Sequence, residues 1–180
     1  MSLTETEYAV LRQTIATRGT VRMALLPMTL IGWAAVGGAF GSEPHRLVLS
    51  LGVLVAGFEA IHALHVGVER IGRYIQVYYE AAADSPRWET TAMAVGPALP
   101  GGGIDPLFTI VFVAATIANL IPAMTVHFTR LELPLLALLH LLFVVRLVRA
   151  RGAAARQRAV DLETFRAIRS QVARDGRPTV

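Results

Sequence analysis

One helix-length stretch carries most of the side chains that could do chemistry. Residues 59–80 read EAIHALHVGVERIGRYIQVYYE, and successive residues of an α-helix are rotated by about 100°. On such a helix the polar side chains share about 140° of the surface. They are Glu59, His62, His65, Glu69, Arg70, Arg73, Gln76 and Glu80. This polar stripe begins inside an apolar run, where an ionisable group is costly and therefore indicates a function.

Two further polar residues lie near the middle of other apolar runs, Asn119 in residues 106–129 and His140 in residues 133–148. If the helices pack together, Glu59, Asn119 and His140 meet near the middle of a bilayer. His62 and His65 then follow toward one membrane surface, about 4.5 and 9 Å farther along the helix. We therefore expect an intramembrane polar cluster of Glu59, His62, His65, Asn119 and His140.

Two interpretations of this cluster need no cofactor. In the first, Glu59 hydrogen-bonds His62, His140 or Asn119 and simply joins helices. In the second, the Glu and His side chains form a track for protons or ions, because each group both accepts and donates a proton.

The third interpretation is a haem or divalent-metal site, with Glu59, His62, His65 and His140 as ligands. Glu59-x-x-His62 matches half of the Glu-x-x-His pattern that di-iron helix bundles use, and the sequence holds no second copy of it. Histidines on facing helices are haem ligands, although a chain without cysteine excludes covalent c-type attachment. We predict no particular cofactor on this evidence.

The second part of the stripe has the character of a contact surface. Its members are Glu69, Arg70, Arg73, Tyr74, Gln76 and Glu80, and Glu69 and Arg73 stand at the i,i+4 spacing of a helical ion pair. Tyrosine is common where a helix leaves the membrane. These residues predict a cytoplasmic face for a partner protein or for lipid.

Composition indicates the class of protein that holds this stripe. The chain has 180 residues, of which 54% are hydrophobic, and it contains no cysteine, which excludes disulfides and thiolate sites. The four apolar runs 23–41, 47–68, 106–129 and 133–148 each suit a bilayer of about 30 Å. They predict an all-α polytopic membrane protein with four transmembrane helices, at about 23–41, 47–83, 106–129 and 133–149. The second helix extends beyond the membrane.

Arginine is distributed unequally between the two sides of these runs. Only Arg46 and Arg130 fall on one side, and all other arginines fall on the opposite side or at the end of the fourth run. The positive-inside rule then puts both termini in the cytoplasm, and the expected location is the bacterial inner membrane. A signal peptide cleaved near Gly41 is the weaker interpretation, because the leading 22 residues include Glu5 and Glu7.

The remaining segments lie on the cytoplasmic side in this interpretation. Residues 1–22 precede the bundle of residues 23–148, and residues 86–105 form a loop rich in proline and glycine. Residues 150–174 predict an arginine-rich amphipathic helix whose apolar side is Leu162, Phe165, Ile168 and Val172. Its partner is anionic lipid or another subunit, and we do not expect nucleic acid.

The second helix also has two contrasting apolar faces. Gly52, Ala56, Ala60, Ala63 and Gly67 form a small-residue face, which permits close approach of another helix. Leu54, Ile61, Leu64 and Val68 form the opposite face, and we expect them to contact lipid.

The sequence therefore favours a non-catalytic component of a membrane assembly, either a homo-oligomer or an accessory subunit. A proton- or ion-conducting protein is the alternative, followed by a haem- or metal-binding redox protein. No arrangement of Ser, His and Asp or of paired carboxylates indicates an enzyme.

Overall fold

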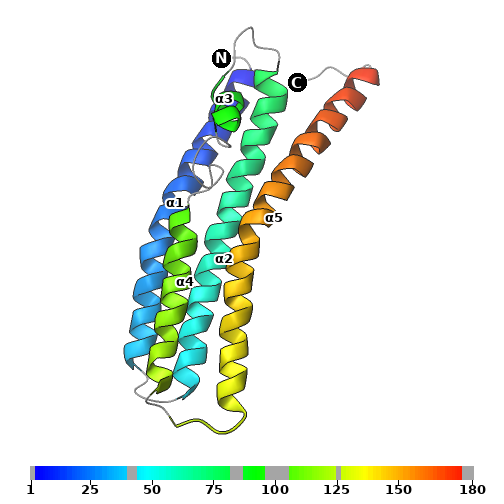
Figure 1. Cartoon of the computed structure of the whole chain (residues 1–180). Helices are drawn as coiled ribbons and strands as arrows, with labels where there is room; N and C mark the ends of the chain where they lie inside the picture. The colour runs from blue at the N-terminus through cyan, green and yellow to red at the C-terminus, as the bar shows by residue number, and fades with distance from the viewer. Residues whose placement is uncertain (1–2, 40–43, 82–86, 96–105, 125–126, 176–180) are drawn as a thin grey trace. The chain divides into compact units, whose positions relative to one another are not determined.

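The structure is a computed structural model that describes residues 3–39, 44–81, 87–95, 106–124 and 127–175, and these residues are almost entirely helical (Figure 1). The α-helices are α1 (Leu3–Ala39), α2 (Pro44–Ile75), α3 (Trp88–Val95), α4 (Pro106–Leu120) and α5 (Glu132–Arg174). A π-helical turn, η1 (Gln76–Glu80), continues α2, and a 3₁₀ turn, η3 (Ile121–Met124), continues α4. The all-α prediction is confirmed for this part of the chain.

Three helices are long and apolar enough to cross a membrane. They are Thr4–Ala39, His45–Glu80 and Glu132–Arg174, whereas the apolar helix Phe108–Met124 is shorter. Many large apolar side chains on these helices are exposed, including Met28, Ile31, Leu135 and Leu141. Exposed apolar surface of this extent is typical of contact with lipid. These features are those of an integral membrane protein.

The helices contribute to two compact units, which are described separately. The apolar unit comprises residues 22–63 and 105–151, and the polar unit comprises residues 1–21, 64–104 and 152–180. Each of α1, α2 and α5 has residues in both units.

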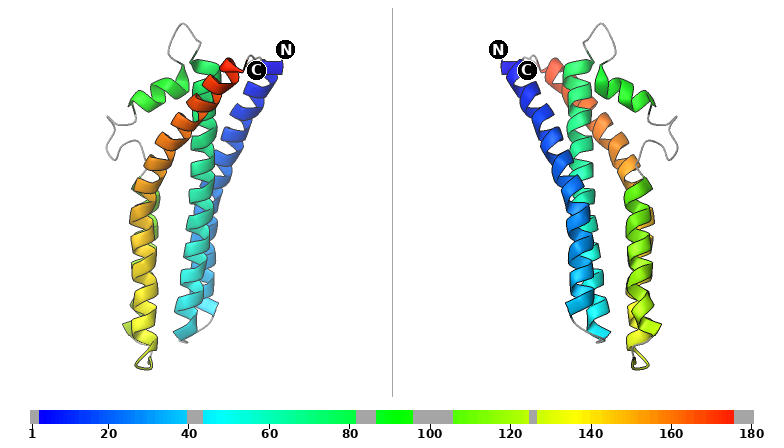
Figure 2. Two further views of the ribbon diagram at one scale, coloured as in Figure 1. Left: turned by 90° about the vertical axis from the view of Figure 1, so that its right-hand side faces the viewer. Right: turned by 90° about the vertical axis from the view of Figure 1, so that its left-hand side faces the viewer.

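In the apolar unit the helices run side by side, α1 with α2 and α4 with α5 (Figure 2). The buried core lies where α2, α4 and α5 meet, and Leu25, Leu26, Leu30 and Trp33 of α1 pack against it. Phe58 is at its centre, with edge-to-face contacts to Phe112 and Phe143 at centroid distances of 5.4 and 5.9 Å. Such aromatic contacts stabilise a core beyond the apolar area that they bury.

The expected orientation of α2 was wrong. Leu54 and Ile61 are buried in the core, although we expected them to contact lipid, and Gly52, Ala56, Ala60 and Ala63 are exposed. The close helix contact is made at Gly57 instead, where an added Cβ would lie 2.2 Å from the Thr29 side chain. The large apolar residues of α2 therefore fill the core, and Gly57, which lies among them, leaves room for α1 to pack closely.

The third apolar run forms a shorter helix than its length suggests. We expected helix over residues 106–129, but α4 ends at Leu120 and gives way to η3. Pro122 has no N–H for an α-helical hydrogen bond, and its ring clashes with the preceding turn. Asn119 consequently lies at the end of α4 and not at its middle. Asp105, which precedes this helix in the sequence, is outside the described residues.

A reciprocal pair of hydrogen bonds starts α5. The Glu132 carboxylate accepts a hydrogen bond from the Thr129 N–H at 2.8 Å, and the Thr129 hydroxyl accepts one from the Glu132 N–H at 3.4 Å. This capping box satisfies two N–H groups that a helix start would leave unpaired. From there α5 continues to Arg174, so the helix predicted for residues 150–174 is the second part of one longer helix.

The loop expected over residues 86–105 contains a helix, so this prediction was wrong for residues 88–95. The Glu80 carboxylate accepts hydrogen bonds from the backbone N–H groups of Glu89 and Thr90, at 3.0 and 2.8 Å. It also accepts one from the Thr90 hydroxyl. A carboxylate from η1 therefore caps α3, and an anion at a helix N-terminus is favourable. The run Gly101–Gly103 and the expected helix end at Ala83 are outside the described residues.

Replacing Gly57 tests the close contact of α1 with α2. Gly57→Ala should lower the free energy of unfolding by about 1–3 kcal/mol, because the new methyl group overlaps Thr29. The control Gly38→Ala adds the same methyl group to α1 where nothing lies within 4 Å, and it should not destabilise. Thermal unfolding of the full chain in mild detergent measures both. Equal midpoints for the two variants would show that the contact is absent.

Removing the Glu80 carboxylate tests the cap of α3. In Glu80→Ala the amide protons of Glu89 and Thr90 should exchange faster, because they lose their acceptors at a cost of about 0.5–2 kcal/mol. Hydrogen exchange with mass spectrometry reports the peptide that covers α3. Glu163→Ala, which removes an exposed carboxylate from α5, is the control and should leave that peptide unchanged.

Candidate functional site

Asn119 connects α4 to the three long helices α1, α2 and α5 in the apolar unit. Its Oδ1 accepts hydrogen bonds from Trp33 Nε1 of α1 at 2.9 Å and from the Ser50 hydroxyl of α2 at 2.6 Å. Its Nδ2 donates to the Leu47 carbonyl of α2 at 2.9 Å and lies 3.0 Å from His140 Nε2 of α5. Every hydrogen-bonding position of the amide is therefore occupied.

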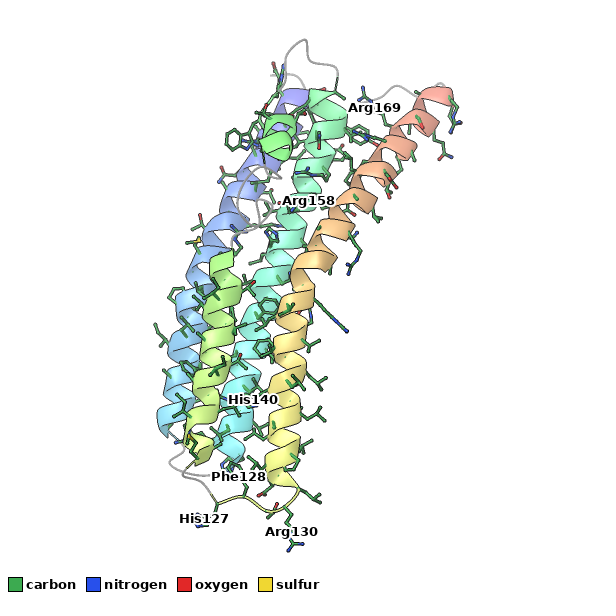
Figure 3. All side chains as sticks on the ribbon, viewed as in Figure 1. His127, Phe128, Arg130, His140, Arg158 and Arg169 are labelled. Atoms are coloured by element: carbon green, nitrogen blue, oxygen red, sulfur yellow. The ribbon has the colours of Figure 1, made fainter. Side chains whose placement is uncertain are left out.

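The chemistry of these partners fixes the state of His140. The Trp33 N–H can only donate and the Leu47 carbonyl can only accept, so the orientation of the Asn119 amide is determined. Its N–H then requires an unprotonated Nε2 on His140, and the proton of the imidazole is on Nδ1, 2.8 Å from the Leu136 carbonyl. His140 is thus a neutral imidazole with both ring nitrogens engaged; its position on α5 is shown in Figure 3.

Glu59 lies apart from this group of residues. We expected it beside Asn119 and His140, but its carboxylate pairs with the Arg146 guanidinium of α5 at 2.8 Å. Ser50 and Glu59 are nine residues apart on α2, which is about 13 Å along a helix. Arg146 also lies over the Phe58 ring, 5.6 Å from its centroid. The expected polar cluster is therefore divided into an Asn119 group and a Glu59–Arg146 ion pair.

The two remaining histidines of the expected cluster lie one turn apart on α2. His62 stacks on Phe58, with centroids 5.7 Å apart and ring planes 8° apart. His65 is part of the polar unit, whereas Glu59 and His62 are part of the apolar unit.

The metal and haem interpretations receive no geometric support. Within the described residues, no three His, Asp or Glu side chains lie close enough to hold a metal ion. An axial bond from His140 to haem iron would require it to release Asn119 or the Leu136 carbonyl.

The polar unit holds the second half of the stripe in a charged network. Glu69 pairs with Arg158 of α5 at 2.8 Å, and Arg70 pairs with Asp161 at 3.2 Å. Arg73 has a side chain that is only 4% exposed, and it lies 4.0 Å from Glu69 and 3.9 Å from Glu89.

Glu89 of α3 completes this network. Its carboxylate pairs with Arg12 of α1 at 2.7 Å and packs against Gly72, where an added Cβ would lie 2.7 Å from Glu89 Oε2. Gly72 therefore provides the space that brings the Glu89 carboxylate to Arg73. The sequence gives no local sign of this role, since the neighbour of Gly72 comes from another helix.

Aromatic residues join the same helices. The Tyr74 hydroxyl donates to Glu7 of α1 at 3.1 Å, and the Tyr74 ring has an edge contact with Phe165 of α5. Gln76 accepts a hydrogen bond from Arg73 at 3.4 Å, and Glu80 caps α3. The chain itself thus supplies partners for each residue of the predicted contact surface.

Replacing Asn119 tests the Asn119 group. Asn119→Ala should lower the free energy of unfolding by about 1–3 kcal/mol, because four hydrogen bonds to three other helices are lost. In a Trp88→Phe background Trp33 is the only tryptophan, so its fluorescence should change when its N–H loses the acceptor. Thr109→Val in the same background is the control for loss of a polar group from α4. An unchanged Trp33 signal in Asn119→Ala would contradict the arrangement.

No family model, curated protein or solved structure matches this chain.

Proposed function

We propose that this chain is a non-catalytic component of a membrane assembly and that it acts as a homo-oligomer. The supporting observation is the Glu59–Arg146 ion pair, whose side chains are 43% and 38% exposed on the apolar unit. A charged side chain facing lipid costs about 2.5–3.5 kcal/mol near the bilayer centre. A second copy that covers this pair removes the charges from lipid.

The surroundings of the ion pair suit such a contact. Gly52, Ala56, Ala60 and Ala63 are exposed on α2 next to Glu59, and small residues let two helix backbones approach closely. The surface carries one anion and one cation, so it is complementary in charge to a second copy related by a two-fold axis. These two properties favour self-association over a neutral lipid contact.

The membrane arrangement follows from the same proposal. We place both termini in the cytoplasm of a bacterium, in the inner membrane, with α4 as the fourth span. Three spans would put the termini on opposite sides, against the distribution of arginine. The exposed Ile110 and Ile117 of α4 are suited to lipid.

Conduction has less support from the contacts. A proton track requires groups that can change protonation in sequence. His140 is held as a neutral imidazole by Asn119 and Leu136, and Glu59 is paired with Arg146. Both groups therefore already have partners within the chain.

A bulky residue on the small-residue face should dissociate the oligomer. Ala56→Leu enlarges an exposed residue of this face, whereas Ala114→Leu makes the same change at an exposed position of α4. Native mass spectrometry after gentle extraction should show a homo-oligomer for the wild type and for Ala114→Leu, and a monomer for Ala56→Leu.

Two results would contradict the homo-oligomer. The first is a wild-type monomer without associated chains, and the second is a different co-purifying subunit, which would identify an accessory subunit. Flux of ions into liposomes that falls in Glu59→Gln would instead support the conducting alternative.

A further inference from the structure

The polar unit contains an open cavity that the contacts described above leave unfilled. Its volume is about 450 Å³, within the range of about 300–1,000 Å³ typical of small-molecule sites. Its walls come from η1 and the residue after it, from α3 and from α5, and are formed by Gln76, Val77, Ala81, Thr90, Leu162, Arg166, Arg169, Ser170 and Ala173.

Two arginines of α5 give the cavity a positive charge. Arg166 and Arg169 stand at the i,i+3 spacing that places side chains on one helix face. Arg169 donates to the Val77 carbonyl of η1 and points from α5 toward α2 (Figure 3), with its other N–H groups remaining as donors. Arg166 is exposed and has no acidic partner within the described residues.

No carboxylate among the described residues lines the cavity to balance these charges. Glu80 is close in sequence to Val77 and Ala81, but its carboxylate oxygens accept hydrogen bonds from Glu89 and Thr90 of α3. Gln76 uses its oxygen to accept from Arg73, which leaves its N–H₂ as a further donor. The polar groups that remain are therefore mainly donors, as an anion requires.

The rest of the wall is apolar, formed by Val77, Ala81, Leu162 and Ala173. A small inorganic anion would leave this surface in contact with water, whereas an apolar group attached to the anion would cover it. A phosphate ester supplies both parts, since its oxygens match the fixed donors of guanidinium groups. It also offers more charge and more acceptor oxygens than a carboxylate.

We propose that this cavity binds a phosphate ester with a short apolar group, and that Arg166 and Arg169 hold the phosphate. The apolar group lies against Val77 and Leu162. Both a soluble phosphate ester and a phospholipid headgroup have this chemistry. The proposal does not rest on self-association, because every residue of the cavity belongs to the polar unit.

Calorimetric titration of the full chain in an uncharged detergent tests the ligand class. The probes are inorganic phosphate, butyl phosphate, dihexanoyl phosphatidic acid and dihexanoyl phosphatidylcholine, all at one salt concentration. We expect at least one of the two anionic esters to bind at least tenfold more tightly than inorganic phosphate and phosphatidylcholine. Preference for the lipid identifies a headgroup site, and preference for butyl phosphate identifies a soluble ligand. Binding of no ester, or of inorganic phosphate with equal affinity, would overturn the proposal.

Variants of α5 test the place of binding. Arg166→Gln should weaken ester binding about tenfold, since it removes a charged hydrogen-bond donor from an exposed position that folding does not need. Arg174→Gln removes the same charge from an exposed position outside the cavity, and it should change affinity by less than twofold. Ala173→Leu keeps the charge and fills apolar volume, so it should also weaken ester binding. Equal losses in Arg166→Gln and Arg174→Gln would show general attraction to a basic helix and would overturn the proposal.

Discussion

The apolar unit depends on the requirement that a buried amide must satisfy all of its hydrogen bonds. Asn119 is 4% exposed, and it meets this requirement with one or more groups from each of α1, α2 and α5. A shift of any one helix along its axis would break at least one of these bonds, and the unsatisfied group would cost about 1–3 kcal/mol. The aromatic core around Phe58 supplies attraction without a unique register. The hydrogen bonds of the Asn119 amide therefore determine the register of the helices, and the apolar contacts around Phe58 stabilise the helices in that register.

In the polar unit the buried group that needs partners is a charged one, the guanidinium of Arg73. Arg73 is buried, so its guanidinium needs nearby anions, and Glu69 and Glu89 provide them from α2 and α3. Each of these carboxylates also pairs with a second arginine, Arg158 for Glu69 and Arg12 for Glu89. Four helices are thus joined by one network. The residues that the sequence predicts as a contact surface for another molecule are therefore used largely for contacts within the chain.

The sequence predicts the helices well and their contacts poorly, for a physical reason. Apolar runs and the spacing of Glu69 and Arg73 are local, and so is the Thr129–Glu132 capping box, a signal that was present but not used. The partner of Glu59 is not local, because Arg146 is 87 residues away and several polar groups have similar expected depth. Whether Leu54 or Gly52 is buried likewise depends on which face of α2 packs against α4 and α5, and the local sequence does not determine this. The helix α3 was missed because its cap, Glu80, comes from another helix.

The Ser50 hydroxyl has two hydrogen-bond acceptors, and this has a consequence for how the chain inserts as it is synthesised. A hydroxyl has one proton, and Ser50 has two good acceptors for it, the Arg46 carbonyl at 2.8 Å within its own helix and Asn119 at 2.6 Å. The ribosome produces α1 and α2 before α4, so the nascent hairpin lacks Asn119 when it first enters the bilayer. During that interval the Ser50 hydroxyl can donate to the Arg46 carbonyl, so its proton is not left without a hydrogen bond in lipid. When α4 is inserted, the Ser50 hydroxyl can exchange its bond to the Arg46 carbonyl for the bond to Asn119. The same hydroxyl therefore serves the α1–α2 hairpin first and the contact with α4 later.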